Sequence, residues 1–399
     1  MEIIKIYRAG VCIVLLLVSV NCFAERKFVI NPKIEMGFQN DSNFWKSEHN
    51  EVSVNTYSVK PGIILGFETP RTQVYFDATL QPFWYDDQDS PPAGVRDASD
   101  DDYTGFTGLF NANYQLSDRL SLGLSDRAYV TRDPAEADIY SDSVSRDKYT
   151  INYLEPNAYY RLTDKFGLRS AYRNTNTYYE EDIEDSSENR GIFDLYYALN
   201  RTSTFYLDYQ VWARDYDQTS SNYTSNQVTL NYERTLKYFS FLGGAGYQHR
   251  SFEDAALDNL DLFTWKLQVK RMDADSTVQT TRSRLLLEVG QSMNDVGSGD
   301  EYYTASYVRF EGGYRLTELI EASAKAKYQN SDYDQSPEND DTYLLSGKLG
   351  YKPLDYLTLG IEGGYETRDS NFDGIDYKNT FVLFTLAVNY DFGKQQLQE

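Results

Sequence analysis

His249 and Ser251 are the residues whose types and spacing come nearest to a catalytic pair. On an extended strand, side chains two residues apart point to the same face, so this pair would set an imidazole base beside a hydroxyl nucleophile. Asn259 follows in a predicted loop, ten residues after the histidine. Such a set would activate the serine toward an ester carbonyl.

The His-x-Ser pair resembles that of outer-membrane phospholipase A, in which a nearby Asn completes the set. The Ser-Asn-Gly that follows the pair in that family is missing here, and the chain has no GxSxG elbow, P-loop or dinucleotide fingerprint. His249 also has the ordinary interpretation of a polar residue at a strand end. We therefore predict that the protein is not an enzyme and that it has no catalytic residues.

Metal and thiol chemistry is excluded by composition. The two cysteines, Cys12 and Cys22, lie in the N-terminal segment that precedes the predicted mature chain, and the only histidines are His49 and His249. The acidic run at 100–102 lacks the glycine and terminal glutamate of an EF-hand loop. We predict no metal site and no cofactor. The net charge of −23 also argues against nucleic acid as a partner.

Charged residues recur on one parity of alternating segments. In 260–271, Phe263 and Leu267 share one face while Lys266 and Lys270 share the other. We interpret the charged face as a lumen, lined either by structural ion pairs or by a track that sets conductance and selectivity. The candidates are Arg127, Arg169, Arg173, Asp208, Lys266, Lys270, Arg282, Arg284, Glu288, Arg309, Glu311, Arg315, Lys325, Lys327 and Glu362.

Aromatic residues form two further sets. Tyr75, Tyr129 and Trp212 have the lumen parity and are candidates for stacking against sugars. A tyrosine also recurs beside each short turn, where an amphipathic ring would lie at the level of the lipid headgroups. This predicted interfacial girdle comprises Tyr114, Tyr160, Tyr232, Tyr314 and Tyr351.

The elements that must position these residues are long alternating strands joined in hairpins. Copies such as NYQLSDRLSLGLSDRAY (113–129) and GYKPLDYLTLGIEGGYETR (350–368) pair two strands across a short polar turn. Aromatics make up 15% of the chain, yet no apolar run beyond residue 24 is long enough for a membrane helix. The predicted strands are 28–45, 55–69, 72–86, 102–116, 119–132, 147–162, 166–180, 189–199, 203–216, 223–235, 238–252, 260–271, 279–294, 302–316, 319–333, 341–352, 356–369 and a closing strand at 376–392.

The sequence therefore predicts an all-β fold, a transmembrane antiparallel up-and-down barrel of about 18 strands. An even strand number puts both termini on one side, predicted to be periplasmic, and the long acidic loops on the extracellular side.

Residues 1–24 read as a signal peptide with a short apolar core at 11–20, cleaved after Ala24; lipidation at Cys22 is the alternative. Residues 25–399 form one barrel domain with a short C-terminal tail. We expect it in the outer membrane of a Gram-negative bacterium, with membrane lipid as its partner.

The segment 36–80 resembles the putative beta-barrel porin 2 family. Its members tend to begin with a YDDN-aromatic segment, matched here by Asp41, Ser42, Asn43 and Phe44, followed by a Pro-Gly strand, matched by 61–63. The resemblance implies a role in exopolysaccharide or capsule production, with polysaccharide and its synthesis and export machinery as partners. The favoured hypothesis is a conduit or accessory protein for that export. The alternatives are a general diffusion porin for small solutes and a non-conducting structural or surface barrel.

Overall fold

The computed structural model describes residues 27–88, 90–92, 94–133, 146–180, 184–218, 220–271, 282–295, 302–334 and 336–392. The predicted signal peptide and the tail after residue 392 lie outside the described residues. No helix within these ranges is long and apolar enough to cross a membrane.

Eighteen strands make up nearly all of the described chain. They are β1 (Lys27–Asp41), β2 (Val54–Glu68), β3 (Thr72–Asp87), β4 (Tyr103–Gln115), β5 (Leu120–Thr131), β6 (Tyr149–Arg161), β7 (Phe166–Tyr179), β8 (Ser186–Asn200), β9 (Ser203–Tyr216), β10 (Tyr223–Thr235), β11 (Phe239–Phe252), β12 (Leu260–Arg271), β13 (Ser283–Asp295), β14 (Tyr302–Arg315), β15 (Ile320–Tyr333), β16 (Asn339–Leu354), β17 (Leu357–Ser370) and β18 (Tyr377–Asn389). A short 3-10 helix, η1 (Ala98–Asp101), precedes β4.

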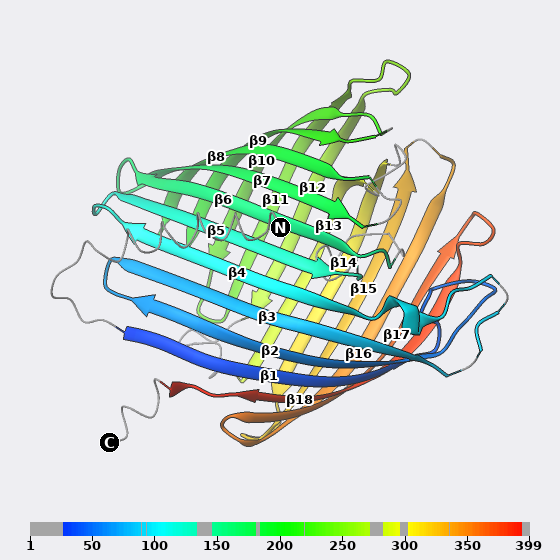
Figure 1. Ribbon diagram of the computed structural model, residues 1–399. Coiled ribbons are helices and arrows are strands. Elements are labelled where there is room, and N and C mark those ends of the chain that lie inside the picture. The colour runs from blue at the N-terminus through cyan, green and yellow to red at the C-terminus, as the bar shows by residue number, and fades with distance from the viewer. Residues whose placement is uncertain are drawn as a thin grey trace.

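The strands close into a single antiparallel barrel. Each strand pairs with its neighbours in sequence, and β1 pairs with both β2 and β18, so Lys33 faces Gly62 on one side and Asn389 on the other. Figure 1 shows β1 lying between β2 and β18. The predicted fold class is confirmed. Short turns join β2 to β3, β4 to β5, β6 to β7, β8 to β9, β10 to β11, β14 to β15 and β16 to β17 at one end of the barrel. At the same end β12 and β13 are separated by the longer segment 272–282, and the connections at the other end are all longer than these short turns.

Several strand ends differ from the prediction by three or more residues: β13 begins at Ser283 and not at 279, and β8 begins at Ser186 and not at 189. The closing strand was expected over 376–392, but β18 ends at Asn389, after which the Tyr390 amide still donates to Pro32 O, at 3.0 Å. The first strand was expected to reach residue 45, but β1 ends at Asp41. The reason is local: the Asn43 side chain accepts from Ser47 N at 3.0 Å and donates to Ser47 O at 2.7 Å, which closes a turn.

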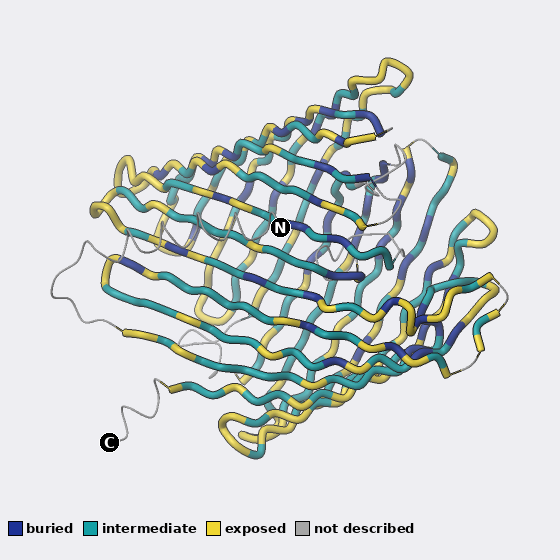
Figure 2. Tube along the Cα trace, viewed as in Figure 1, coloured by how far each residue is buried: buried dark blue, intermediate teal, exposed yellow. Residues whose placement is uncertain are grey.

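The two faces of the sheet differ in chemistry. Large apolar side chains on one parity are exposed around the outside, for example Leu65, Leu230, Phe263 and Leu345. Side chains of the other parity are mostly polar and more buried, so exposure alternates along strands such as β9 and β10 (Figure 2). An apolar exterior with a polar interior is the pattern of a barrel that faces lipid.

Contacts that reach over a whole strand identify the concave face. Lys33 on β1 lies 2.6 Å from Asp77 on β3, and the chain between them is β2 at Gly62. A Cβ at Gly62 would lie 2.8 Å from the Lys33 side chain and 2.7 Å from Ala78 O. In the same way Gln227 on β10 donates to Thr264 on β12, at 3.1 Å, across β11. Side chains converge like this only on the inside of a curved sheet.

Adding one methyl group at Gly62 should destabilise the barrel. Gly62→Ala puts a carbon against the β3 backbone and the Lys33 stem, and overpacking of this kind costs about 1–3 kcal/mol. The free energy of unfolding in detergent micelles, measured by guanidinium titration, should fall accordingly. Gly350→Ala is the matched control, because its Cβ would meet only Glu321 O at 3.8 Å. Equal stability of the two variants would contradict this explanation.

Candidate functional site

The lumen wall carries ion pairs between neighbouring strands. Arg169 on β7 contacts Glu155 on β6 at 2.6 Å and Asp194 on β8 at 3.0 Å. Arg173 contacts the other oxygen of Glu155, also at 2.6 Å. Asp208 on β9 stands opposite Asp194 and accepts a hydrogen bond from Gln210 at 2.9 Å. These four strands therefore share one charged network.

The other predicted lumen charges on strands also have the inward parity. Lys266 contacts Glu288 at 3.0 Å, Arg284 contacts Glu321 at 2.9 Å, Lys325 lies 4.0 Å from Glu362, and Arg309 pairs with Glu311. The remaining strand positions, placed by parity alone, are Arg127, Lys270, Arg315 and Lys327. Arg282 lies just before β13, with its guanidinium 5.5 Å from the Tyr314 ring centre. The role of the whole set in conduction stays a prediction.

The predicted aromatic sets fall on opposite faces. Tyr114, Tyr160, Tyr232, Tyr314 and Tyr351 have the outward parity and stand near the short-turn ends of their strands. Tyr75, Tyr129 and Trp212 have the inward parity, on β3, β5 and β9. Trp212 is only 4% exposed, so its ring is part of the wall rather than an open platform.

At the long-loop end, connections fold onto the inner wall. Phe44, in the connection between β1 and β2, packs against inward-facing Tyr85 with ring centres 4.9 Å apart. Arg146 lies over the Phe44 ring at 3.8 Å and donates to its carbonyl at 2.8 Å. Asp101 of η1 pairs with Arg132 at 3.2 Å. The mouth is therefore narrowed along β1–β5.

A cavity of about 330 Å³ is formed by the inward faces of β8 to β13. It is basic and amide-rich, and one indole closes part of its wall. The lining residues are Glu188, Arg190, Trp212, Arg214, Tyr223, Gln227, Gln248, Arg250, Thr264, Gln291, Ser292, Met293 and Asn294.

Arg250 is the unusual member of this cavity. Its side chain is held between two rings, 4.1 Å from the Tyr223 centre and 5.1 Å from the Tyr302 centre, and the residue is 2% exposed. Within the described residues, neither Nε nor Nη1 of Arg250 has a hydrogen-bond acceptor, and the same is true of Trp212 Nε1 and Asn294 Nδ2. Buried donors of this kind are expensive to leave unsatisfied. The wall therefore presents several N–H groups ready for an acceptor.

Arg190 differs because it is anchored. It donates to Glu188 at 2.8 Å and to Gln210 at 2.9 Å, and its guanidinium lies 4.0 Å from the Trp212 ring centre. This stack fixes the indole and covers it.

One acid lies close enough to Arg250 to feel its charge. The Asp334 amide donates to Tyr302 O at 2.8 Å, beside the ring on which Arg250 rests. Burial raises the pKa of the Asp334 carboxyl, Asp332 raises it further, and Arg250 opposes both effects. When it is ionised, the Asp334 carboxylate partly cancels the positive potential of the Arg250 guanidinium.

Sequence reasoning missed Arg250. The one feature of the sequence that could have indicated it is strand alternation, which places residue 250 on the inward face between the outward residues His249 and Ser251. The structure does bring that outward pair together, with Ser251 Oγ 2.9 Å from His249 Nε2. The expected partner Asn259 is wrong: Asp261 Oδ1 lies 2.7 Å from His249 Nδ1, because β12 begins at Leu260 and places Asp261 opposite the histidine.

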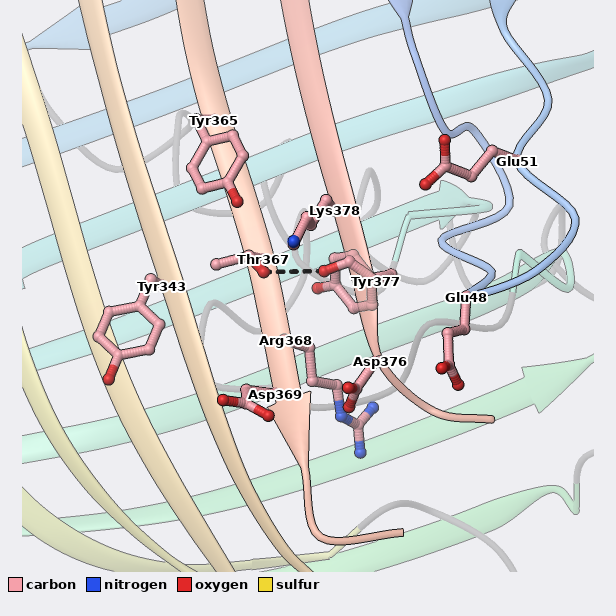
Figure 3. A pocket seen from close by; sticks show the side chains of 10 residues that line it. All are labelled: Glu48, Glu51, Tyr343, Tyr365, Thr367, Arg368, Asp369, Asp376, Tyr377 and Lys378. Atoms are coloured by element: carbon pink, nitrogen blue, oxygen red, sulfur yellow. Dashed lines mark hydrogen bonds between the residues drawn. The ribbon is translucent and has the colours of Figure 1, made fainter. Parts of the chain in front are cut away.

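A second cavity, of about 530 Å³, lies at the rim of the barrel (Figure 3). Tyr343 and Tyr365 stand on the outward faces of β16 and β17, with Glu48 and Glu51 of the first loop across from them. Its walls mix carboxylates, tyrosines and Lys378, and it does not border the lumen cavity around Arg250. No group of three or more potential metal ligands is found in the described part of the chain.

Comparison with known proteins supports the architecture. Residues 243–390 match the family model described as putative beta-barrel porin 2, which confirms the resemblance, although the match excludes the segment 36–80 that suggested it. No curated protein matches the chain by sequence. The Pseudomonas aeruginosa structures of OpdK with vanillate and of OccK9 (OpdG) each give a TM-score of 0.50 at 11% identity, over 91% of this chain and 99% of theirs. The chain therefore shares the β-barrel fold of these structures, and its residues 243–390 are similar to a porin family model.

Removing the guanidinium from Arg190 should uncover Trp212. In Arg190→Ala the stack and both anchoring hydrogen bonds are lost, so the indole becomes accessible from the lumen. Acrylamide should then quench a larger share of the fluorescence, with Trp212 as one of four tryptophans. The increase should vanish when Trp212→Phe is added. An unchanged quenching curve for Arg190→Ala alone would refute the stacked arrangement.

Proposed function

We propose that this protein is an outer-membrane channel for small hydrophilic solutes, in which the cavity around Arg250 binds an anionic group of the solute. The observation that carries the proposal is the set of buried, unsatisfied donors on Arg250, Trp212 and Asn294 in the lumen wall. A carboxylate is a strong acceptor for such donors and forms charge-assisted hydrogen bonds with a guanidinium.

The surroundings of the cavity favour a small ligand. A volume of about 330 Å³ is near the lower end of the range for small-molecule sites, about 300–1,000 Å³. A polar lumen in a barrel of this strand number is wide enough for an aqueous path. The packing of Phe44 onto Tyr85 narrows the mouth, which favours single solutes over a polymer.

Exopolysaccharide export, which the family resemblance implies, is the weaker alternative. A polymer path calls for open stacking surfaces, whereas Trp212, one of the three predicted platforms, is only 4% exposed and its ring is covered by Arg190. A non-conducting barrel is the other alternative. We do not assign a catalytic role to the lumen.

Planar-bilayer recording tests the channel directly. Purified barrel should conduct in potassium chloride, and a small carboxylate such as vanillate should reduce that conductance from the lumen. Liposome swelling should show entry of monosaccharides and small acids but exclusion of long oligosaccharides. In a deletion strain, surface and secreted polysaccharide should stay at the wild-type level. Absence of conductance, or a loss of polysaccharide, would overturn the proposal.

Arg250→Gln should weaken block by the carboxylate by about tenfold or more, since a charge-assisted hydrogen bond contributes about 1.5–3 kcal/mol. Arg284→Gln is the matched control, because it removes the same charge from the lumen wall outside the cavity, where Arg284 pairs with Glu321. Block is measured as the concentration that halves the conductance. Equal weakening in both variants would show a general charge effect rather than a site.

Asp334→Asn should have the opposite effect. Removal of the carboxylate leaves the potential of Arg250 less compensated, so block at neutral pH should tighten by about threefold, within the ~1 kcal/mol typical of screened charges. Because the pKa of Asp334 is raised, its carboxylate is protonated at a higher pH than that of an ordinary aspartate. Lowering the pH should therefore tighten block of the wild type, as the substitution does at neutral pH. The variant should lose this acid-induced gain. A variant that keeps the full pH response would rule out Asp334 as its source.

A further inference from the structure

Three polar side chains on the outer face of the barrel form a continuous hydrogen-bonded chain. Ser251 Oγ lies 2.9 Å from His249 Nε2, and His249 Nδ1 lies 2.7 Å from Asp261 Oδ1. β11 supplies the serine and the histidine two residues apart, and its register with β12 sets Asp261 opposite His249. Hydroxyl, imidazole and carboxylate are connected in the order in which a serine nucleophile is activated.

A fourth residue fixes the acid. The Tyr247 hydroxyl donates to the same Asp261 oxygen that His249 contacts. Tyr247 precedes the histidine by two residues and therefore shares its outward face. With Nδ1–H of His249 held by the carboxylate, the Nε2 lone pair points to Ser251, which is the tautomer that a general base requires.

The hydrogen-bonded side chains of Ser251, His249 and Asp261 lie where the apolar outer surface of the barrel ends. Toward the barrel middle the outward neighbours are Phe263, 60% exposed, and Leu230, 57% exposed. Toward the long-loop end the outward residues are Ser251 and Thr224, which face each other across β11 and β10. The acyl esters of membrane lipids lie at this same boundary between hydrocarbon and headgroups. The nucleophile is therefore at the depth of a lipid ester.

The neighbouring strand offers groups to stabilise a developing oxyanion. β10 places Asn226 directly opposite His249 and Thr224 directly opposite Ser251, and both side chains are exposed on the outer face. A side-chain amide or hydroxyl beside the nucleophile can donate to the negative oxygen of a tetrahedral intermediate.

We propose that Ser251, His249 and Asp261 form a hydrolytic site for acyl esters of membrane lipids on the outer face of the barrel. Ser251 Oγ attacks the ester carbonyl while His249 Nε2 takes the hydroxyl proton. The carbon–oxygen bond to the glycerol or sugar alcohol then breaks, and His249 gives its proton to the departing oxygen. Water attacks the acyl-serine with His249 again as base, which releases the fatty acid and restores Ser251.

This site is separate from the lumen. Arg250, between the two reacting residues in sequence, points to the opposite face. The two proposals therefore fail independently: loss of hydrolysis need not change conductance, and loss of anion block need not change hydrolysis.

The experiment uses the full-length barrel in mixed micelles of detergent and dioleoylphosphatidylcholine, with released fatty acid as the readout. Wild type should release fatty acid, and Ser251→Ala should reduce the rate by at least about a hundredfold. Ser187→Ala is the matched control, because Ser187 also stands on the outward parity near the long-loop end of its strand, β8. Its rate should equal that of wild type. Heat-modifiable migration of all three proteins in a denaturing gel shows that each barrel is folded, whether or not it conducts.

A covalent probe supplies a second readout. A fluorophosphonate should label the wild type at Ser251, located by mass spectrometry of the peptide, and His249→Asn should lose this labelling. Asp261→Asn should keep a reduced rate with a shifted pH profile, as expected for a residue that positions the histidine. The proposal is overturned by a wild type that neither hydrolyses lipid nor reacts with the probe, or by Ser251→Ala retaining the wild-type rate.

Discussion

The structure depends on the need to pair every backbone N–H and C=O of a chain that lies in hydrocarbon. An unpaired group there costs several kcal/mol, so an open sheet edge is not tolerated. The pairing of β1 with β18, which sets Lys33 opposite Asn389, removes the last edge. Closure in turn gives every strand one inward and one outward face. The apolar exterior, the ion-paired interior and both candidate sites follow from that division.

The division is sharpest in three consecutive residues of β11. His249 and Ser251 point outward and contact each other, while Arg250 points inward and rests on Tyr223 and Tyr302. A period of two residues thus puts the proposed lipid chemistry and the proposed solute contact on one strand, on opposite faces of the barrel wall. A shift of register by one residue would exchange the two faces and place the guanidinium in lipid.

Sequence reasoning was accurate where local pattern decides the outcome. The number of strands, their parity and the tyrosines beside the short turns are all local, so alternation and turn residues were enough. The Arg250 cavity needed the registers of six strands, since residues as distant in sequence as Trp212 on β9 and Asn294 on β13 line it together. The choice of Asp261 over Asn259 depended on where β12 begins. The packing of Phe44 on Tyr85 is a tertiary contact that no alternation encodes.

The net charge of −23 is a poor guide to what the lumen prefers. Inward carboxylates are largely paired: Glu155 and Asp194 hold Arg169, and Glu288 holds Lys266. A paired charge adds little to the potential felt by a passing ion, because its partner cancels it within a few ångströms. Arg250 has stacking partners but no hydrogen-bonded acid in the described chain, so its charge and its donors stay directed to the cavity. Selectivity is therefore expected to follow this guanidinium, which Asp334 compensates only in part, rather than the overall acidity of the chain.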